Sequence, residues 1–298
     1  MSLMDTIATE RVAGIERVGV VGCGLMGSGI AEVCARHGLD VMVMEVSPES
    51  AEVGRQRVFG SLEHAVRRGK LSEEERDSAA GRLAFTTEPD ELGDRQLVIE
   101  AVVEEERAKV DTFELLDRVV KDQDAVLATN TSSIPIMKLA MATDRPEQVV
   151  GMHFFNPVPV LPLVEVVSSL LTAAETTEFA TAFAQDRLAK KVIHSQDRAG
   201  FIVNALLIPY LLSAIRMLES GFATAADIDS GMVEGCAHPM GPLALADLIG
   251  LDTTLAIANS LYEEFREQLY APPPLLSRMI DAGLLGRKAG RGFYEYNR

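Results

Sequence analysis

A strand, a glycine-rich turn, a helix and a second strand follow one another near the start of the chain. The β-branched run 17–21 leads into the turn Gly-Cys-Gly-Leu-Met-Gly at 22–27. A helix with good propensity is expected from Leu25 to about His37, and Gly38 stands where a glycine ends a helix. A second buried strand at 40–44 follows. This order of elements constrains the fold more than any other feature, because it is the opening unit of a doubly wound α/β sheet.

The residue types in this unit suit a dinucleotide. Gly22 permits the tight turn, Gly24 lets the backbone approach a pyrophosphate, and Gly27 allows the helix to pack closely on the strand. The helix N-terminus, including Leu25 and Met26, offers N–H donors to phosphates. Glu45, 18 residues past the third glycine, can accept hydrogen bonds from ribose hydroxyls and repels a 2′-phosphate, so NAD is favoured over NADP. The alternative is a glycine-rich turn without a ligand; the surrounding elements argue against it.

Composition limits the remaining possibilities. A chain of 298 residues with 47% hydrophobic and 24% charged residues is globular and long enough for two domains. Its net charge of −16 argues against nucleic acid and anionic membranes as partners. No apolar run reaches the roughly 18 to 20 residues of a membrane span, and the first residues resemble no export signal. Three cysteines without metal-ligand spacing predict reduced thiols in a cytoplasm and no metal site.

Two antiparallel helices are predicted next, at 48–69 and 72–83. Ser72 is a candidate N-cap, with Glu75 as its capping-box partner. The first helix and the turn after it carry an island of positive charge on an acidic protein. Arg55 and Arg57 are interpreted as a solvated face. Two interpretations stay open for Arg67, Arg68 and Lys70, which are either solvated or in contact with an anion.

Further buried strands are predicted at 96–100 and 124–128. The first enters the stretch 101–104, and a helix is predicted from there to about Lys121. Hydroxyl and amide side chains fill 129–133 after the second of these strands, where open α/β sheets bind ligands. Ser133 is interpreted as an N-cap of the following helix, whereas Ser132 is a candidate ligand contact.

The stretch 149–167 is apolar but carries His153, Asn156 and Glu165. Two β-branched runs flank a centre with three prolines, a pattern that predicts strand, extended bend and strand. Such a return brings Glu165 near His153. A histidine held by a carboxylate in apolar surroundings is a base suited to neutral pH. The alternative is a core histidine bonded to a backbone carbonyl.

The second half is mainly helical. A helix at 176–188 and a short strand at 190–194 precede helices that are expected at 201–221, 225–236, 242–250 and 252–266. Several of these are apolar on more than one side, which indicates a second buried surface such as a dimer interface. Asn204, near the start of the first long helix, is either a capping group or a ligand contact.

Six ordered motifs together resemble the L-3-hydroxyacyl-CoA dehydrogenase family, most closely its short bacterial 3-hydroxybutyryl-CoA dehydrogenase branch. They are Gly-Cys-Gly-Leu-Met-Gly-Ser-Gly-Ile-Ala, Val-Ile-Glu-Ala-Val-Val-Glu, Thr-Asn-Thr-Ser-Ser-Ile, Gly-Met-His-Phe-Phe-Asn-Pro-Val-Pro, Leu-Val-Glu-Val-Val and Gly-Phe-Ile-Val-Asn. The resemblance implies a Rossmann-like α/β domain with a mostly parallel, doubly wound sheet and an inserted helical hairpin, followed by an all-α domain. The expected domains are an N-terminal extension at 1–14, the NAD-binding domain at 15–196 and a helical dimerisation and substrate domain at 197–298.

The resemblance also implies roles for single residues. His153 is the general base, Glu165 is its orienting carboxylate, and Ser132 and Asn204 contact the reacting substrate. Expected cofactor contacts are Gly22, Gly24, Leu25, Met26, Gly27, Glu45, Glu104, Lys109, Ser132, Asn156 and Lys288. Expected substrate contacts are Ser61 and Arg68, for coenzyme A, together with Ser132 and Asn204.

The expected reaction is NAD-dependent oxidation of an (S)-3-hydroxyacyl-CoA to the 3-ketoacyl-CoA, and its reverse, in a cytoplasmic homodimer without a metal. Two alternatives remain. A related dehydrogenase acting on a 3-hydroxy acid without CoA, or on a sugar acid, would share the glycine-rich unit and the His-Glu pair. A non-catalytic NAD-binding protein would have no use for His153, Glu165 and Ser132 together.

Overall fold

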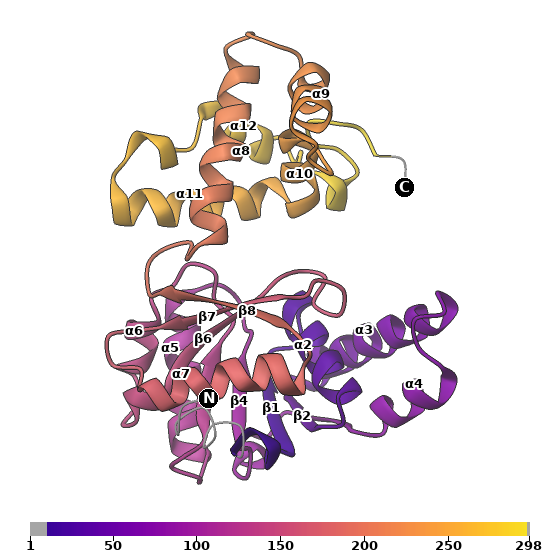
Figure 1. The fold of residues 1–298 in the computed structure, drawn as a ribbon, viewed down its shortest axis with the longest axis vertical. Coiled ribbons are helices and arrows are strands. Elements are labelled where there is room, and N and C mark those ends of the chain that lie inside the picture. Colours follow the sequence, from indigo (N-terminus) through magenta and orange to yellow (C-terminus); the bar gives the residue numbers. More distant parts are fainter. Residues whose placement is uncertain (1–10, 297–298) are drawn as a thin grey trace. The chain divides into compact units, whose positions relative to one another are not determined.

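The computed structural model describes residues 11–296 and divides the chain into two compact units, Met1–Arg198 and Ala199–Arg298. Residues 1–10, most of the expected extension, lie outside the described residues. Val12 packs in the core of the first unit with 1% exposure. Helices and strands of both units are labelled in Figure 1.

The predicted opening unit is confirmed. Strand β1 (Arg17–Val21) leads through the turn to helix α2 (Leu25–Arg36) and then to strand β2 (Asp40–Met44). Gly38 has a φ of +85°, a left-handed conformation that suits a glycine just past the end of a helix. β1 and β2 pair in parallel, with Val21 opposite Met44.

The first unit contains a sheet with the strand order β3-β2-β1-β4-β5-β6-β7-β8. Its further strands are β3 (Leu83–Thr86), β4 (Leu97–Glu100), β5 (Val126–Thr129), β6 (Val149–Phe154), β7 (Leu163–Ser168) and β8 (Lys191–Gln196). All described neighbours are parallel except β6 and β7. The sheet is therefore doubly wound and mostly parallel, as predicted.

The helical hairpin consists of α3 (Pro48–Arg67) and α4 (Glu73–Ala80), which extend away from the β1–β2 side of the sheet in Figure 1. The capping box of α4 is confirmed: Ser72 Oγ accepts the N–H of Glu75, and the Glu75 carboxylate accepts the N–H of Ser72. The expected end of this helix near Leu83 is wrong. The helix ends at Ala80, and Leu83 begins β3, which pairs in parallel with β2.

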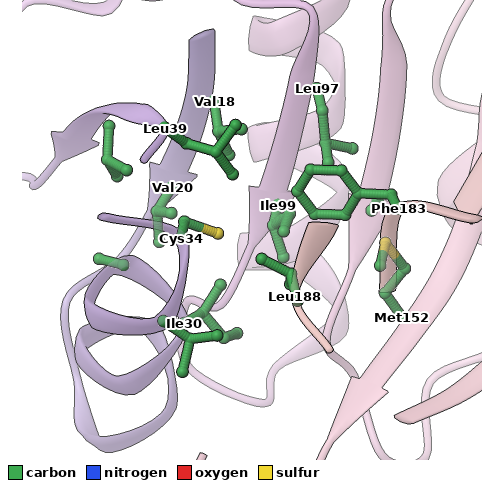
Figure 2. Close-up of a cluster of buried hydrophobic side chains, with 14 of the residues drawn as sticks. Val18, Val20, Ile30, Cys34, Leu39, Leu97, Ile99, Met152, Phe183 and Leu188 are labelled. Carbon is green, nitrogen blue, oxygen red and sulfur yellow. The ribbon is translucent and has the colours of Figure 1, made fainter. Parts of the chain in front are cut away.

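Helices cover both faces of the sheet. α2, α7 (Ala174–Ala182) and the π-helical turn η3 (Phe183–Arg187) pack on one face, where Ile30, Cys34 and Phe183 meet strand side chains in the main core (Figure 2). α6 (Ile136–Ala140) contacts β6 and, together with α5 (Glu106–Val119), forms a second layer. Gly151 of β6 faces α6, because a Cβ there would lie 3.0 Å from Ile136 Cδ1.

The return of the chain at 149–167 is also confirmed. β6 and β7 pair antiparallel, with His153 opposite Glu165 and Gly151 opposite Val167. β8 then pairs in parallel with β7 and forms one edge of the sheet. The apolar, β-branched composition of β6 and β7 fits their burial between helix layers.

The second unit is helical within its described residues. It contains α8 (Val203–Glu219), α9 (Ala225–Cys236), α10 (Pro242–Ile249), α11 (Leu251–Phe265) and α12 (Pro274–Asp281). α10, α11 and α12 contact α8, the long vertical helix in Figure 1. α12 was not expected from the sequence. Short 3-10 turns complete the elements: η1 (Pro89–Leu92), η2 (Pro146–Gln148), η4 (Gln268–Tyr270) and η5 (Arg287–Ala289).

Within residues 11–296, no single helix is long and apolar enough to cross a membrane. α10 and α11 pass that test of length and composition only as a pair, and they are bent by 97°.

Candidate active site

Four neighbouring strands present polar groups on the same face of the sheet. Val126 and Ala128 of β5 belong to the core on the α2 side, so Thr129, the next residue, points to the opposite face. By the same alternation Glu100, His153 and Glu165 point to that face. In register, Glu100 lies beside Thr129, and Thr129 beside Gly151. The strand pattern therefore gathers these groups near the carboxyl ends of β4, β5 and β6, where doubly wound sheets bind ligands.

The innermost pair is His153 and Glu165. His153 Nδ1 lies 2.7 Å from Glu165 Oε2, and the two side chains are 8% and 0% exposed. A carboxylate only accepts hydrogen bonds, so Nδ1 carries the proton and the ring's lone pair resides on Nε2. The Phe155 ring lies 4.6 Å from the imidazole, centroid to centroid. The pair thus has the geometry of an oriented base in an apolar wall.

A buried ammonium lies between two carboxylates at the end of β4. Lys109 Nζ, from α5, is 2.6 Å from Glu100 Oε1 and 3.3 Å from Glu104 Oε2, and the Lys109 and Glu100 side chains are at most 1% exposed. Glu100 also accepts hydrogen bonds from the hydroxyl of Thr129 and the N–H of Val102, both at 2.7 Å. Both Glu100 oxygens therefore have partners inside the buried cluster.

Glu104 connects this cluster to the loop after β5. Its Oε1 accepts the Thr131 hydroxyl at 2.6 Å, the Ser132 N–H at 2.8 Å and the Ser132 hydroxyl at 3.2 Å. Burial raises the pKa of Glu104, but the Lys109 ammonium and the hydrogen bonds from Thr131, Ser132 and Ser133 together hold the pKa below its usual range. The structure therefore brings together three of the residues that the family resemblance implies as cofactor contacts: Glu104, Lys109 and Ser132.

The expected role of Ser133 as an N-cap is wrong. Its hydroxyl donates to Glu104 at 3.0 Å. The first turn of α6 is instead capped by Asp197, whose two oxygens accept the N–H groups of Ile136 and Met137 at 2.8 Å each. A carboxylate at this helix N-terminus is also favoured by the helix dipole.

The glycine-rich turn fits a pyrophosphate. Gly22 has a φ of +89°, and a Cβ on Gly27 would lie 1.8 Å from the Gly22 carbonyl oxygen, so both positions require glycine. A Cβ on Gly24 would meet nothing within 4 Å, which leaves the backbone open to a ligand. α2, which begins at Leu25 and Met26, has no side-chain cap and no acid in its first turn. Its N–H groups are thus available to phosphate oxygens.

Glu45 and Arg57 both hold the turn from outside. The Glu45 carboxylate accepts the N–H of Cys23, and Arg57 Nη1 donates to the Cys23 carbonyl at 2.6 Å. Arg55 lies over the Phe85 ring at 4.5 Å. Arg57 is exposed and Arg55 half-buried, as expected for a solvated helix face, but each guanidinium also has a partner outside its own helix.

The remaining predicted residues fall into two groups. Ser61 and Arg68 are exposed on the hairpin, and Asn156 is exposed just after β6. Asn204 and Lys288 belong to the second unit. Asn204 is 8% exposed at the start of α8, and Lys288 Nζ bonds both oxygens of Asp252 at 2.6 and 2.5 Å. Their expected ligand contacts stay predictions.

Glu100 is the main residue of the cluster that sequence reasoning did not single out. It stands in the motif Val-Ile-Glu-Ala, and an acid ending an otherwise apolar buried strand was the available signal. Within residues 11–296, no group of three or more His, Cys, Asp or Glu side chains is arranged to hold a metal ion.

Comparison with known protein families covers nearly the whole chain. Residues 17–198 match the model of the 3-hydroxyacyl-CoA dehydrogenase NAD-binding domain, and residues 200–296 match the model of the 3-hydroxyacyl-CoA dehydrogenase C-terminal domain. These ranges meet at the boundary that separates the two compact units.

Individual proteins are also similar. A 3-hydroxybutyryl-CoA dehydrogenase of Mycobacterium tuberculosis is 60% identical over 286 residues, which cover 95% of this chain and 99% of that protein. The crystal structure of M. tuberculosis FadB2 superposes with a TM-score of 0.94 at 60% identity, covering 95% of this chain and 99% of that one. The crystal structure of (S)-3-hydroxybutyryl-CoA dehydrogenase from Ralstonia eutropha has a TM-score of 0.90 at 43% identity, covering 96% and 100% of the two chains.

Proposed function

The chain belongs to the 3-hydroxyacyl-CoA dehydrogenase family, and from this membership we propose that its substrate is (S)-3-hydroxybutyryl-CoA. It is an NAD-dependent enzyme that interconverts 3-hydroxyacyl-CoA and 3-ketoacyl-CoA. The observation that carries the choice of a short acyl chain is the 60% identity to a 3-hydroxybutyryl-CoA dehydrogenase over 95% of the chain.

The turn and its neighbours would hold the cofactor. The N–H groups at the start of α2 would bind the pyrophosphate, for which Gly24 leaves space, and Glu45 would accept hydrogen bonds from the ribose hydroxyls. Glu104 and Lys109 would contact the nicotinamide end of the cofactor, and Ser132 belongs to the same hydrogen-bond cluster. Asn156 and, from the second unit, Lys288 complete the proposed cofactor contacts. When bound, NAD supplies the acceptor for the hydride that leaves C3 of the substrate.

His153 acts as the general base in this proposal. Its Nε2 takes the proton of the substrate's 3-hydroxyl, because Nδ1 is committed to Glu165 at 2.7 Å. The imidazolium that forms is stabilised by the buried Glu165 carboxylate, which also fixes the ring orientation. In the reverse direction the same imidazolium returns the proton to the 3-keto oxygen. Ser132 and Asn204 orient the reacting oxygen and the acyl chain.

The hairpin would hold the coenzyme A moiety. Ser61 and Arg68 are exposed there, with Arg67 and Lys70 close in sequence. Among the described residues, none of these three cations has a carboxylate within the 4.0 Å of an ion pair. An exposed group of cations without counter-charges suits the phosphates of coenzyme A.

We further propose a cytoplasmic homodimer formed through the second unit. Large apolar side chains are exposed on this unit, including Leu206 at 73% and Phe222 at 79%. Apolar side chains of this size favour burial against a second copy. Size-exclusion chromatography with light scattering measures the mass, and a monomer at micromolar concentration would contradict the dimer.

One assay tests the reaction. The protein is mixed with NADH and acetoacetyl-CoA, and loss of the near-ultraviolet absorbance of NADH is followed. Free acetoacetate at the same concentration is the matched control for the CoA moiety. We expect turnover of acetoacetyl-CoA to exceed that of acetoacetate by orders of magnitude. Equal turnover of both would instead favour a dehydrogenase of acids that carry no CoA.

A further inference from the structure

The main chain of Cys23 is held by two opposite charges. Its N–H is bonded by the Glu45 carboxylate, and its carbonyl by the Arg57 guanidinium at 2.6 Å. The two charges therefore flank one residue of the turn, the residue between Gly22 and Gly24. The pKa of the Cys23 thiol is raised to about 12, mainly by burial and also by the Glu45 carboxylate, while the Arg57 guanidinium lowers it, so both charges act on the same atom.

The position of Arg57 follows from the packing of α3. A Cβ on Gly54 would lie 2.5 Å from Cys23 Cβ, so α3 presses its glycine directly on the turn. Arg57 is three residues further along α3 and lies on the same helix face. The helix thus carries the guanidinium to the turn, where the carbonyl of Cys23 fixes it.

Arg57 differs from its neighbours in its partners. Arg55 pairs with Glu52 at 3.6 Å and covers Phe85. Arg57 has only a neutral carbonyl as hydrogen-bond partner among the described residues, and no carboxylate within 4.0 Å. One of its five donors is used on this carbonyl, so a charged fork remains for an anion.

From this arrangement we propose that Arg57 is a second residue that contacts the adenosine ribose. Glu45 alone then keeps the site from binding a 2′-phosphate. An acid near the ribose repels that phosphate, whereas an arginine nearby accommodates it. Here Glu45 and Arg57 both bond the main chain of Cys23, and the Glu45 carboxylate makes the site prefer NAD over NADP. The inference rests on the proposed role of Glu45 at the ribose.

Direct binding tests the inference without relying on turnover. NADH and NADPH are titrated by nicotinamide fluorescence against wild type, E45Q, R57Q, E45Q/R57Q and E45Q/R55Q. We expect E45Q to weaken NADH binding and to tighten NADPH binding by about ten-fold, the size of one charge-assisted hydrogen bond. The gain should disappear in E45Q/R57Q and persist in E45Q/R55Q, the matched control from the same helix.

A second probe isolates the phosphate. Competition of 2′,5′-ADP and 5′-AMP against NADH is measured on the same variants, and only 2′,5′-ADP should gain affinity in E45Q through Arg57. The inference is overturned if E45Q binds NADPH no more tightly than wild type does, or if E45Q/R57Q binds NADPH as tightly as E45Q does. Either result overturns it even when Glu45 proves important for NADH. An E45Q variant with unchanged NADH affinity removes the role of Glu45 and the inference together.

Folding is checked by the thermal unfolding midpoint of each variant. If E45Q/R57Q does not fold, E45Q/R57K retains the charge but loses the planar fork that binds phosphate bidentately. We then expect a smaller NADPH gain than in E45Q. An undiminished gain in a folded E45Q/R57K protein would contradict the role of the guanidinium.

Discussion

His153 Nδ1 lies 2.7 Å from Glu165 Oε2, and the two residues face each other directly across β6 and β7. Both side chains are buried, so solvent does not screen the pair. The carboxylate fixes which ring nitrogen carries the proton, and this defines what each substitution should change.

His153→Ala and Glu165→Gln should lower kcat by about two to four orders of magnitude while NADH affinity changes little. The first removes the base, and the second removes the charge that stabilises the imidazolium. Steady-state rates with acetoacetyl-CoA and fluorescence titration of NADH measure the two effects separately. A His153→Ala enzyme within a few-fold of wild type would sink the assignment of the base.

The Glu100–Lys109 pair should be important for stability. Glu100→Ala leaves the Lys109 ammonium buried beside Glu104 alone, and the free energy of unfolding should fall by about 3 to 5 kcal/mol. Lys138→Met is the matched control, since its pair with Glu106 is half-exposed on both sides and should contribute less than about 1 kcal/mol. Urea unfolding measures both, and equal losses would show that the buried pair has no special role.

Two glycines of the turn should respond differently to alanine. At Gly24, with a φ of −65° and open space around its Cβ position, alanine should leave stability nearly unchanged but weaken NADH binding by about ten-fold or more. At Gly27 the new Cβ would clash with the Gly22 carbonyl, so the free energy of unfolding should fall by about 1 to 3 kcal/mol. Thermal unfolding and NADH titration check both variants. A Gly24→Ala protein with normal NADH affinity would argue against a pyrophosphate at this turn.

The three cysteines should differ in reactivity. Burial raises the pKa of the Cys23 and Cys34 thiols to about 12, whereas Cys236 is exposed. At mildly alkaline pH the first two thiols therefore stay protonated in the folded protein, and a disulfide reagent should label only Cys236 rapidly. The raised pKa values also contribute to the free energy of unfolding. This contribution is fully present below the pKa of an unfolded thiol, about 8.5, and is lost as the pH rises toward 12, because the unfolded thiols then ionise while the folded ones do not. Mass spectrometry of the labelled protein, folded and in denaturant, counts the thiols; rapid labelling of folded Cys23 would contradict the burial.

Local signals explain what could be predicted from the sequence. The β1–α2–β2 unit was predictable because glycines at fixed positions, a helix end and an acid all lie within one short stretch. The capping box of Ser72 and Glu75 is likewise a contact between residues three apart. The pairing of β6 with β7 followed from two β-branched runs that flank prolines, and it placed Glu165 beside His153.

Long-range contacts explain what was missed. β3 has four residues and is stabilised as a strand by its pairing with β2, about forty residues earlier. α12 begins at Pro274 in a run of prolines that suggests a loop, although proline is well tolerated in the first turn of a helix. The cap of α6 comes from Asp197, 61 residues away from Ile136. The residues next to each of these elements in the sequence do not indicate these contacts.

In a site built on loops, the length of a loop affects the distance between the catalytic side chains. The antiparallel pairing of β6 and β7 makes that distance independent of the loop. Ladder hydrogen bonds hold His153 opposite Glu165, so the length of the segment at 155–162 does not determine their distance. Insertions or exchanges in that segment should therefore be tolerated by the proton-transfer pair. A slip of one residue in the pairing of β7, by contrast, would turn Glu165 to the opposite face and leave the histidine without its carboxylate. The site is thus a rigid two-residue module whose geometry is set by the pairing of two strands.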